Sequence, residues 1–347
     1  MTLQTKVRDC GPIYIKINSS QRMAVFSYAI GDSPDEFFVG VERNCLVVIM
    51  QSQHNLKLNL SAINDGIWHH LSIIIGRTRK KIFLNGSTIY SEPMVNHSLP
   101  LLRGGGVVAI GQKLEYFSSC KEAMKYGSSK DGVYLIKTDT SLGYSRVFCM
   151  KNILGCSGEG WTLVMKIDGE KKTFDFDSSL WKNKNSYKIE NGKTGLDNLE
   201  TKLPTYWSTK INKICVGMKF KDETNFMSFK FQAKSLYDVI ADGKYHQTNV
   251  SQNEWMSLIK DSVLQQNCNK EGFNAKAELE TFARIRIGIV GNNENDCRTS
   301  DSFIGFGGLY NSIYCGGKFQ INSCGNSAYC TGKPLIELRS MGYIFVS

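Results

Sequence analysis

The densest group of residues that can bind a metal lies in the last third of the chain. Asparagine, aspartate and glutamate carry the hard oxygen atoms that calcium prefers, and calcium takes about six to eight of them. Six such residues fall close together on one loop: Asn292, Asn293, Glu294, Asn295, Asp296 and Asp301. They are candidate calcium ligands. The alternative is a turn whose side chains cap their own backbone, and the sequence leaves both interpretations open.

Eleven cysteines provide a second kind of chemistry. None lies in a Cys-x-x-Cys pair and no histidine stands nearby to complete a zinc site, so we expect disulfides and an oxidising compartment. Four cysteines crowd the loop-rich C-terminal end with a pairing that the sequence does not specify: Cys297, Cys315, Cys324 and Cys330. Because the total is odd, at least one thiol is free, or pairs with another chain or with a segment outside this sequence.

The sequence contains no motif that indicates catalysis. It lacks the Gly-x-Ser-x-Gly nucleophile elbow, the His-Glu-x-x-His zinc motif and the Walker phosphate loop. The run Gly104-Gly105-Gly106 lies in a strand-rich region without a following helix, so we interpret it as a turn. We predict no catalytic residue and do not expect an enzyme.

The charge balance is basic, with 42 lysines and arginines against 32 acidic residues and a net charge of +10. This balance favours anionic partners. The basic residues are spread along the chain and no nucleic-acid-binding module is recognisable, so we do not expect nucleic-acid binding. No apolar run approaches the roughly 20 residues of a membrane-spanning helix. We therefore expect no transmembrane segment.

Five Asn-x-Ser sequons agree with a secreted protein, and they begin at Asn18, Asn59, Asn85, Asn96 and Asn249. Sequons also occur by chance, so some of them can be unmodified. The first eleven residues are polar and charged, without the apolar core of a signal peptide. We therefore expect an N-terminus that is incomplete or processed.

The elements that position these residues are mainly strands. At 347 residues the chain exceeds a single core, so we expect two domains. Short apolar and alternating runs punctuated by turn residues extend from about residue 22 to residue 112. The dipeptide Asn85-Gly86 after the run Lys81–Leu84 is a strong hairpin signal. This pattern predicts a β-sandwich.

The N-terminal third resembles the laminin-G and pentraxin group of jelly-roll, concanavalin-like sandwiches. The resemblance rests on Asp65–Leu71, Ile82–Gly86 and Gly104–Gln112, which match a turn, a hairpin and a late glycine-rich strand of that group. It implies a sandwich over residues 1–117, although the closing strands of the group are missing. The calcium site of pentraxins is not carried over, because Lys113–Tyr116 offers a single glutamate. Adjacent His69 and His70 face opposite sides of a strand, so structural roles are expected for them.

The remaining residues, 118–347, resemble a fibrinogen C-terminal-like domain of the fibrinogen and intelectin group, an α+β fold. The resemblance rests on Ser119–Glu122, Asp131–Ile136, Val147–Met150 and Gly160–Met165 in order. It implies a disulfide between Cys120 and Cys149, which would join two neighbouring strands and contribute about 3 kcal/mol. In this domain we expect Trp161, Trp181 and Trp207 to pack in the core: large aromatic side chains dominate buried area.

Departures from this family limit what its function implies here. The alternating aspartates of fibrinogen domains are absent, and Thr299, Ser300 and Asp301 stand where intelectin-like lectins carry a histidine pair for calcium and a sugar diol. A sugar site is therefore not carried over, and calcium stays a possible cofactor only through the loop described above.

These observations favour a secreted extracellular matrix or adhesion protein, with a calcium-dependent lectin of the fibrinogen-like or intelectin-like type as the alternative. The pairing of modules is similar to uncharacterised skeletal organic matrix proteins of stony corals, which implies deposition in an extracellular, biomineral-associated matrix. Expected partners are matrix proteins or glycans. Because the basic balance is unsuited to direct contact with mineral calcium, mineral-associated acidic polymers are the partners that the charge favours.

Overall fold

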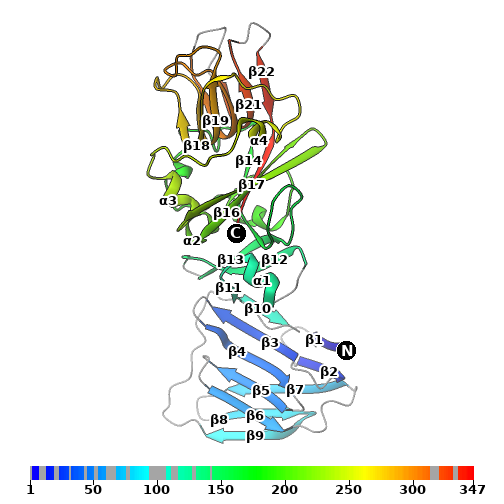
Figure 1. Ribbon diagram of the computed structural model, residues 1–347. Helices are drawn as coiled ribbons and strands as arrows, with labels where there is room; N and C mark the ends of the chain where they lie inside the picture. Colours follow the sequence, from blue (N-terminus) through cyan, green and yellow to red (C-terminus); the bar gives the residue numbers. More distant parts are fainter. Residues whose placement is uncertain are drawn as a thin grey trace. The chain divides into compact units, whose positions relative to one another are not determined.

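In the computed structural model the described residues are 2–7, 13–18, 23–30, 33–42, 45–50, 54–59, 68–75, 79–93, 107–110, 116–126, 130–140, 143–312, 320–330 and 335–347. The chain forms two compact units (Figure 1). Unit 1 comprises Met1–Tyr116 and Ser141–Gly143, and unit 2 comprises Phe117–Thr140 and Tyr144–Ser347. Antiparallel strands dominate both units, so the protein is β-rich.

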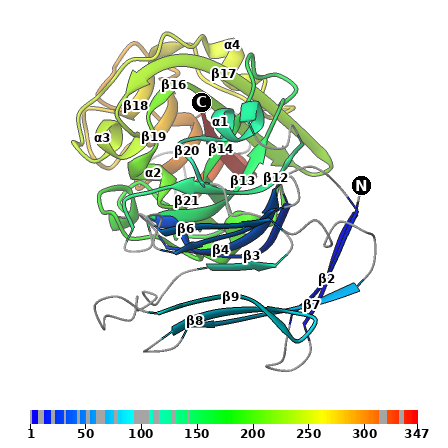
Figure 2. The ribbon, with the colours of Figure 1, turned by 90° about the horizontal axis from the view of Figure 1, so that it is seen from below.

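Unit 1 consists of two antiparallel sheets of five strands each, which Figure 2 shows as separate layers. The first sheet has the order β1 (Thr2–Val7), β2 (Ile13–Asn18), β7 (Trp68–Ile75), β8 (Arg79–Leu84) and β9 (Ser87–Pro93). The second has the order β10 (Val107–Ile110), β3 (Met23–Ile30), β4 (Ser33–Glu42), β5 (Cys45–Met50) and β6 (His54–Asn59).

The core of unit 1 follows from the two-residue period of its strands. Leu46 and Val48 of β5 lie on one face of their sheet, and Ile82 and Leu84 of β8 lie on one face of the other. All four belong to a single buried cluster, which Leu71 of β7 also joins. Two sheets whose apolar faces share one core are compatible with the β-sandwich that the pattern predicted.

Two local features of unit 1 bear on the sequence interpretation. Asn85 and Gly86 form the turn between β8 and β9, with φ angles of 50° and 82°, so the predicted hairpin is confirmed. The N-terminal residues supply β1 and β2, an antiparallel pair that extends the first sheet beyond β7.

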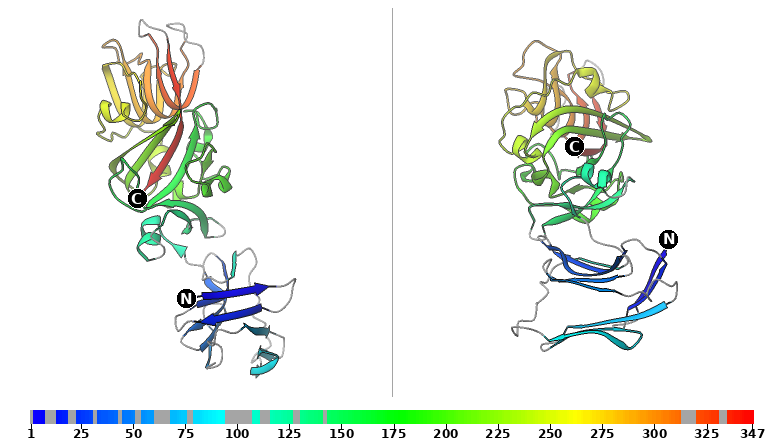
Figure 3. Two further views of the ribbon diagram at one scale, coloured as in Figure 1. Left: turned by 90° about the vertical axis from the view of Figure 1, so that its right-hand side faces the viewer. Right: turned by 60° about the horizontal axis from the view of Figure 1, so that its bottom comes forward.

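Unit 2 contains an eight-stranded sheet and a five-stranded sheet, both antiparallel (Figure 3). We call them the large and the small sheet. The large sheet has the order β11 (Tyr116–Phe117), β12 (Gly132–Lys137), β13 (Tyr144–Met150), β14 (Trp161–Asp168), β23 (Met341–Val346), β16 (Ile211–Phe220) and β17 (Glu223–Ala233), and β15 (Thr201–Lys202) pairs with β14. The small sheet has the order β18 (Asn267–Lys276), β19 (Arg284–Asn292), β20 (Ser302–Tyr310), β21 (Gln320–Ala328) and β22 (Ile336–Arg339).

The helices of unit 2 are short. They are α1 (Cys120–Tyr126), α2 (Thr205–Ser208), α3 (Leu236–Ile240) and α4 (Gln252–Met256), with 3₁₀ turns at Ser179–Trp181 and Ile189–Lys193. Serine side chains begin two of them. Ser235 accepts a hydrogen bond from the N–H of Asp238, and Ser251 forms a capping box with Glu254.

The large sheet is buried on both faces, which explains why its central strands read as continuous apolar runs. Along β23, Tyr343 and Phe345 belong to the core cluster that also contains α1, whereas Ile344 and Val346 belong to the cluster shared with the small sheet. The C-terminal strand lies between β14 and β16 and pairs with both (Figure 3). Residues separated by nearly the whole length of unit 2 therefore close its central sheet.

Three disulfides join described cysteines, and all lie in unit 2. They are Cys120–Cys149, Cys156–Cys215 and Cys268–Cys297. The first is the pair that the fibrinogen-like resemblance implied, except that Cys120 begins a helix and not a strand. Cys330 is also disulfide-bonded. Cys315 lies outside the described residues.

Cys324 corrects the expectation that the C-terminal cysteines form disulfides. It is a free thiol, fully buried within β21 in the core cluster shared by the two sheets. Its Sγ atom lies 3.3 Å from Ser340 Oγ, and burial raises the pKa of the thiol to about 12. A cysteine whose strand position turns it toward the core behaves as a small apolar residue. Cys45 of β5 is the second free cysteine among the described residues.

A row of glycines crosses the small sheet. Gly272, Gly288, Gly305 and Gly325 stand opposite one another on four successive strands. Gly305 has a φ angle of +149°, and a Cβ atom placed on it would lie 2.2 Å from the carbonyl oxygen of Ile287. Neither the backbone conformation nor the space admits a side chain there. The small sheet thus requires glycine at the positions where these residues pair across neighbouring strands.

Replacing Gly305 by alanine is expected to lower the free energy of unfolding by about 3 kcal/mol, through backbone strain and overpacking. The matched control is Gly243→Ala, because Gly243 has a φ angle of +69° but no atom within 4 Å of an added Cβ. That variant should cost about 1 kcal/mol, the penalty of a left-handed backbone alone. Urea unfolding measures both, and equal losses would contradict the close approach between strands.

Candidate functional site

The predicted calcium ligands extend from the end of β19 to the residue before β20, and two of them, Asn292 and Asp296, are occupied within their own loop. Asn292 is 1% exposed, and its Nδ2 atom donates to the carbonyl oxygen of Asp296 at 2.6 Å and to Thr299 Oγ1 at 3.3 Å. Asp296 in turn accepts two hydrogen bonds from the guanidinium of Arg298, at 3.0 and 2.9 Å. These bonds lower the pKa of Asp296. Both side chains act as turn-forming groups.

The other members of the loop do not converge on one point. Asn293 donates to the carbonyl oxygen of Cys330 at 3.1 Å, while Glu294 and Asn295 are exposed. The Cys268–Cys297 disulfide fixes the loop to β18. Within the described part of the chain no group of three histidine, cysteine, aspartate or glutamate side chains is close enough to hold a metal ion. The six predicted ligands therefore do not fit a calcium site formed by their side chains together.

Asp301 differs from the rest of the loop because it is buried. It is 3% exposed, directly before β20, and its Oδ1 atom has no hydrogen-bond partner among the described residues. Gln265 is 7% exposed, and its Oε1 atom likewise has no described partner. Burial raises the pKa of Asp301 to about 7, although a hydrogen bond with Gln265 acts in the opposite direction. Near neutral pH this carboxyl group is thus close to its titration point.

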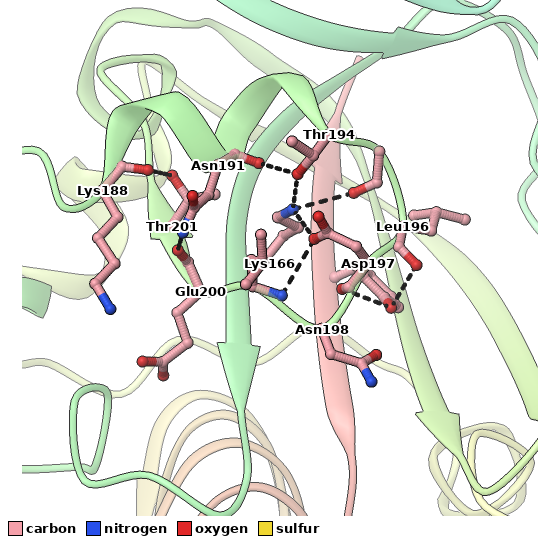
Figure 4. Close-up of polar contacts among 12 residues, drawn as sticks. Lys166, Lys188, Asn191, Thr194, Leu196, Asp197, Asn198, Glu200 and Thr201 are labelled. Atoms are coloured by element: carbon pink, nitrogen blue, oxygen red, sulfur yellow. Dashed lines mark hydrogen bonds and ion pairs between the residues drawn. The ribbon is translucent and has the colours of Figure 1, made fainter.

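A second polar site surrounds Lys166 in β14 (Figure 4). The lysine side chain is fully buried, and Nζ forms an ion pair with Asp197 and donates to Thr194 Oγ1 at 3.1 Å and to the carbonyl oxygen of Gly195 at 3.2 Å. The hydroxyl of Tyr343 in β23 donates to the carbonyl oxygen of Asp197, also at 3.1 Å. The loop that contains Asp197 is therefore fixed to two central strands of the large sheet.

Lys202 in β15 is the second fully buried lysine. Its Nζ atom donates to the carbonyl oxygens of Leu180 and Asn183 and to Asn183 Oδ1. It also lies 4.7 Å from the ring centre of Tyr206 and 5.5 Å from that of Trp207. Burial lowers the pKa of Lys202 to about 7. No described carboxylate forms an ion pair with this lysine, so backbone oxygens and aromatic rings stabilise it.

A cavity of about 440 Å³ lies beside residues 184–186 and Trp207. We call it the Trp207 cavity. Its walls are formed by Asp139, Thr140, Lys184, Asn185, Ser186 and Trp207. All six residues belong to unit 2. Unlike the loop before β20, this cavity brings a cation, a carboxylate, an amide, hydroxyls and an aromatic ring together around open space.

The tryptophans singled out from the sequence are buried, and the two histidines contact neighbouring polar side chains. Trp161 and Trp181 are fully buried and Trp207 is 9% exposed, as expected for core residues, although Trp207 also lines the cavity. His69 Nδ1 contacts Asn85 Nδ2 at 3.0 Å, and His70 Nε2 contacts Ser72 Oγ at 3.1 Å.

The predicted glycosylation sites differ in accessibility. Asn59 and Asn249 are exposed. Asn85 is exposed too, but its Oδ1 atom accepts a hydrogen bond from the N–H of His70 at 2.9 Å, in addition to the contact with His69. The side chain of Asn18, and Asn96 altogether, lie outside what the structure describes.

The sequence interpretation missed the two buried lysines and the cavity. One signal was available: Lys166 interrupts the apolar run Trp161–Met165 with Ile167 directly after it. A charged residue at a core position requires a partner. No sequence pattern identified that partner as Asp197, 31 residues away.

No protein-family model matches the chain, and no curated protein matches it either. Among the described helices none is both long and apolar enough to cross a membrane.

Asp301 is expected to make stability depend on pH. Its ordinary pKa of 3.8 rises to about 7 in the folded protein, so between these values the folded state binds more protons than the unfolded state. The free energy of unfolding should therefore fall by about 3 kcal/mol between pH 5 and 8, and the fall should end above the folded pKa. Asp301→Asn should lack this component, whereas Asp296→Asn should keep it. Parallel pH profiles for wild type and Asp301→Asn would contradict the assignment.

The Lys166–Asp197 pair is expected to show strong coupling. Lys166→Met leaves the carboxylate and two further acceptors without their donor, which should cost about 3 kcal/mol of stability. Asp197→Asn should cost less, since Asp197 is partly exposed. A double-mutant cycle by urea unfolding should give a coupling energy of about 1 kcal/mol or more. Additive losses would show that the two side chains do not interact in solution.

Proposed function

We propose that the protein is a secreted component of an extracellular matrix, or an adhesion protein, that binds acidic partners through unit 2. The observation that carries this proposal is the charge of residues 182–234. This segment contains eleven lysines and five acidic residues, so it holds +6 of the net charge of +10. Ten of the eleven lysines are exposed or partly exposed, Lys202 being the exception. A concentrated positive charge of this kind attracts polyanions.

The lysines of this segment are largely free of neutralising partners. Among the described residues only Lys193 of the eleven forms an ion pair, with Glu190. Lys184, Lys188 and Lys221 instead lie over the rings of Tyr237, Tyr187 and Phe220. Ammonium groups without a carboxylate partner gain most from an external anion. The surface chemistry therefore favours an acidic polymer as the partner.

The disulfides support a location outside the cell. Three bridges between described cysteines tie together segments of unit 2. Disulfides persist in oxidising compartments and are rare in the cytosol. Secretion is part of the proposal, together with the laminin-G-like identity of unit 1 and the fibrinogen C-terminal-like identity of unit 2. The similarity to skeletal matrix proteins of corals adds a mineral-associated matrix as the proposed setting, and no catalytic role is assigned.

A calcium-dependent lectin is the second candidate, and the surroundings of Asp301 favour it. The unpartnered Oδ1 atom of Asp301 and the unpartnered Oε1 atom of Gln265 are, among the described residues, both acceptors in a buried setting. A cation would satisfy both. Asn292 and Asp296 are used within their loop and Asn293 bonds to Cys330, which makes this the weaker proposal.

The proposal predicts salt-sensitive binding to acidic polymers. The full chain should be retained on immobilised alginate in low-salt buffer and released when NaCl reaches about 1 M. At that concentration the Debye length is about 3 Å, so the attraction between the lysines and the polymer is screened. Changing Lys210, Lys230 and Lys234 to glutamine should weaken retention more than the same change at Lys121, Lys130 and Lys137, which are exposed outside the segment. Both variants lose three charges, so their difference measures location.

Two outcomes would overturn this proposal. Equal weakening by the two triple variants would show that net charge alone governs binding, without a role for the lysine-rich segment. Retention that disappears on addition of a calcium chelator would favour the lectin instead. Retention that persists in the chelator, together with the difference between the variants, is the expected result.

A further inference from the structure

The walls of the Trp207 cavity come from three separate parts of unit 2, two of which belong to the lysine-rich segment 182–234. Asp139 and Thr140 follow β12, Lys184–Ser186 belong to the irregular segment after the first 3₁₀ turn, and Trp207 belongs to α2. A volume of about 440 Å³ falls in the range of small-molecule sites. The cavity can therefore hold a ligand of the size of one or two sugar rings.

Hydrogen bonds to Lys202 hold the irregular wall of the cavity, Lys184–Ser186, in one conformation. Lys202 donates to the carbonyl oxygens of Leu180 and Asn183, directly before Lys184. Directly after Ser186, Tyr187 and Lys202 exchange two backbone hydrogen bonds, each of 2.9 Å. The segment Lys184–Ser186 is thus anchored at both ends by the same buried lysine residue. An anchored wall loses little entropy when a ligand binds.

A second anchor holds the residues that precede this wall. The hydroxyl of Tyr206 donates to the carbonyl oxygen of Trp181 at 2.8 Å, and Trp181 Nε1 donates to the carbonyl oxygen of Asp175 at the same distance. Tyr206 and Trp207 are neighbours in α2. The helix that supplies the aromatic wall therefore also fixes the polar wall.

The lining matches the chemistry of a pyranose ring. A sugar presents an apolar face of C–H groups, which an indole covers, and a rim of hydroxyls that both donate and accept hydrogen bonds. Trp207, which is 9% exposed, provides a small aromatic surface, Asn185 can both donate and accept, and the Asp139 carboxylate can accept from hydroxyls. Thr140 and Ser186 add hydroxyl groups of their own.

Lys184 and the neighbouring exposed lysines outnumber the single carboxylate of the cavity, Asp139, so the local charge favours an anionic ligand. Lys184 is exposed, lies 5.3 Å from the ring centre of Tyr237 and has no ion-pair partner among the described residues. Lys182 and Lys188 on the same segment are exposed as well. We propose that the Trp207 cavity binds an anionic sugar unit of an acidic polysaccharide, with Lys184 at its carboxylate or sulfate group. This inference rests on the proposed function and names its ligand class and its site.

The test is calorimetric titration of the full chain with a short alginate oligosaccharide, a dextran sulfate of similar length and neutral dextran. Carboxylated and sulfated probes distinguish the two kinds of anionic group. Lys184→Ala should raise the Kd for the preferred anionic probe about tenfold, because a charged hydrogen bond contributes about 1.5 kcal/mol or more. Neutral dextran should bind much more weakly than either anionic probe.

Two further variants separate the cavity from general attraction. Lys221→Ala removes an exposed lysine that likewise lies over an aromatic ring, 5.1 Å from that of Phe220, but does not line the cavity. It should change the Kd less than twofold. Ser186→Trp fills the cavity without changing the charge and should weaken binding as strongly as Lys184→Ala.

Three results would overturn the inference. If Ser186→Trp binds as the wild type does, or if the two lysine variants weaken binding equally, the anionic polymer is held by surface charge. The proposed function would then stand without this site. If a single-stranded oligonucleotide binds with the same dependence on Lys184 and Ser186 and more tightly than the sugars, the ligand class is wrong. Failure of every anionic polymer to bind would reject the proposed function as well.

Discussion

The arrangement of unit 2 around the Trp207 cavity depends on the hydrogen bonds that the buried Nζ atom of Lys202 donates. A charge removed from water is costly unless its hydrogen bonds are satisfied. Lys202 satisfies them with the carbonyl oxygens of Leu180 and Asn183, since no described carboxylate pairs with it. The long segment between β14 and β16 has little regular structure, so it contributes few ladder hydrogen bonds of its own. The side chain of Lys202 thereby fixes the backbone at Leu180 and Asn183, which belongs to no strand.

Buried cations recur at two further places where irregular segments meet the sheets of unit 2. Lys166 holds the loop of Asp197 against β14. Arg286 of β19 is 2% exposed, donates twice to the carbonyl oxygen of Phe176 and donates to Asn274 Oδ1 at 2.6 Å. Each cation has several donors and a long stem, so it can reach backbone oxygens beyond the edge of a strand. The strands of the sheets are rigid, and these side chains hold the irregular segments against them.

The sequence predicted features that arise from local patterns. Short apolar runs such as Cys45–Ile49 formed strands, and Asn85-Gly86 formed its hairpin, because apolar patterning and turn chemistry act within a few residues. Contacts between distant residues were not predictable. The placement of β23 between β14 and β16 and the partners of the buried lysines depend on tertiary packing. The loop at Asn292 shows the same limit: its composition permitted calcium, and its folded geometry uses Asn292 and Asp296 in a turn.

Hydrogen exchange of the Lys202→Met variant tests the central claim most directly. A methionine side chain keeps the apolar stem and removes the donor, so we expect faster exchange of the amides of Trp181, Lys182 and Tyr187, with β16 and β23 unchanged. The first two amides bond to Ser178 and Ser179, and the third bonds to Lys202 itself. Protection in residues 180–188 equal to that of the wild type would contradict the claim that this buried lysine orders the segment. Loss of protection throughout unit 2 would also contradict it, because the effect would then not be local.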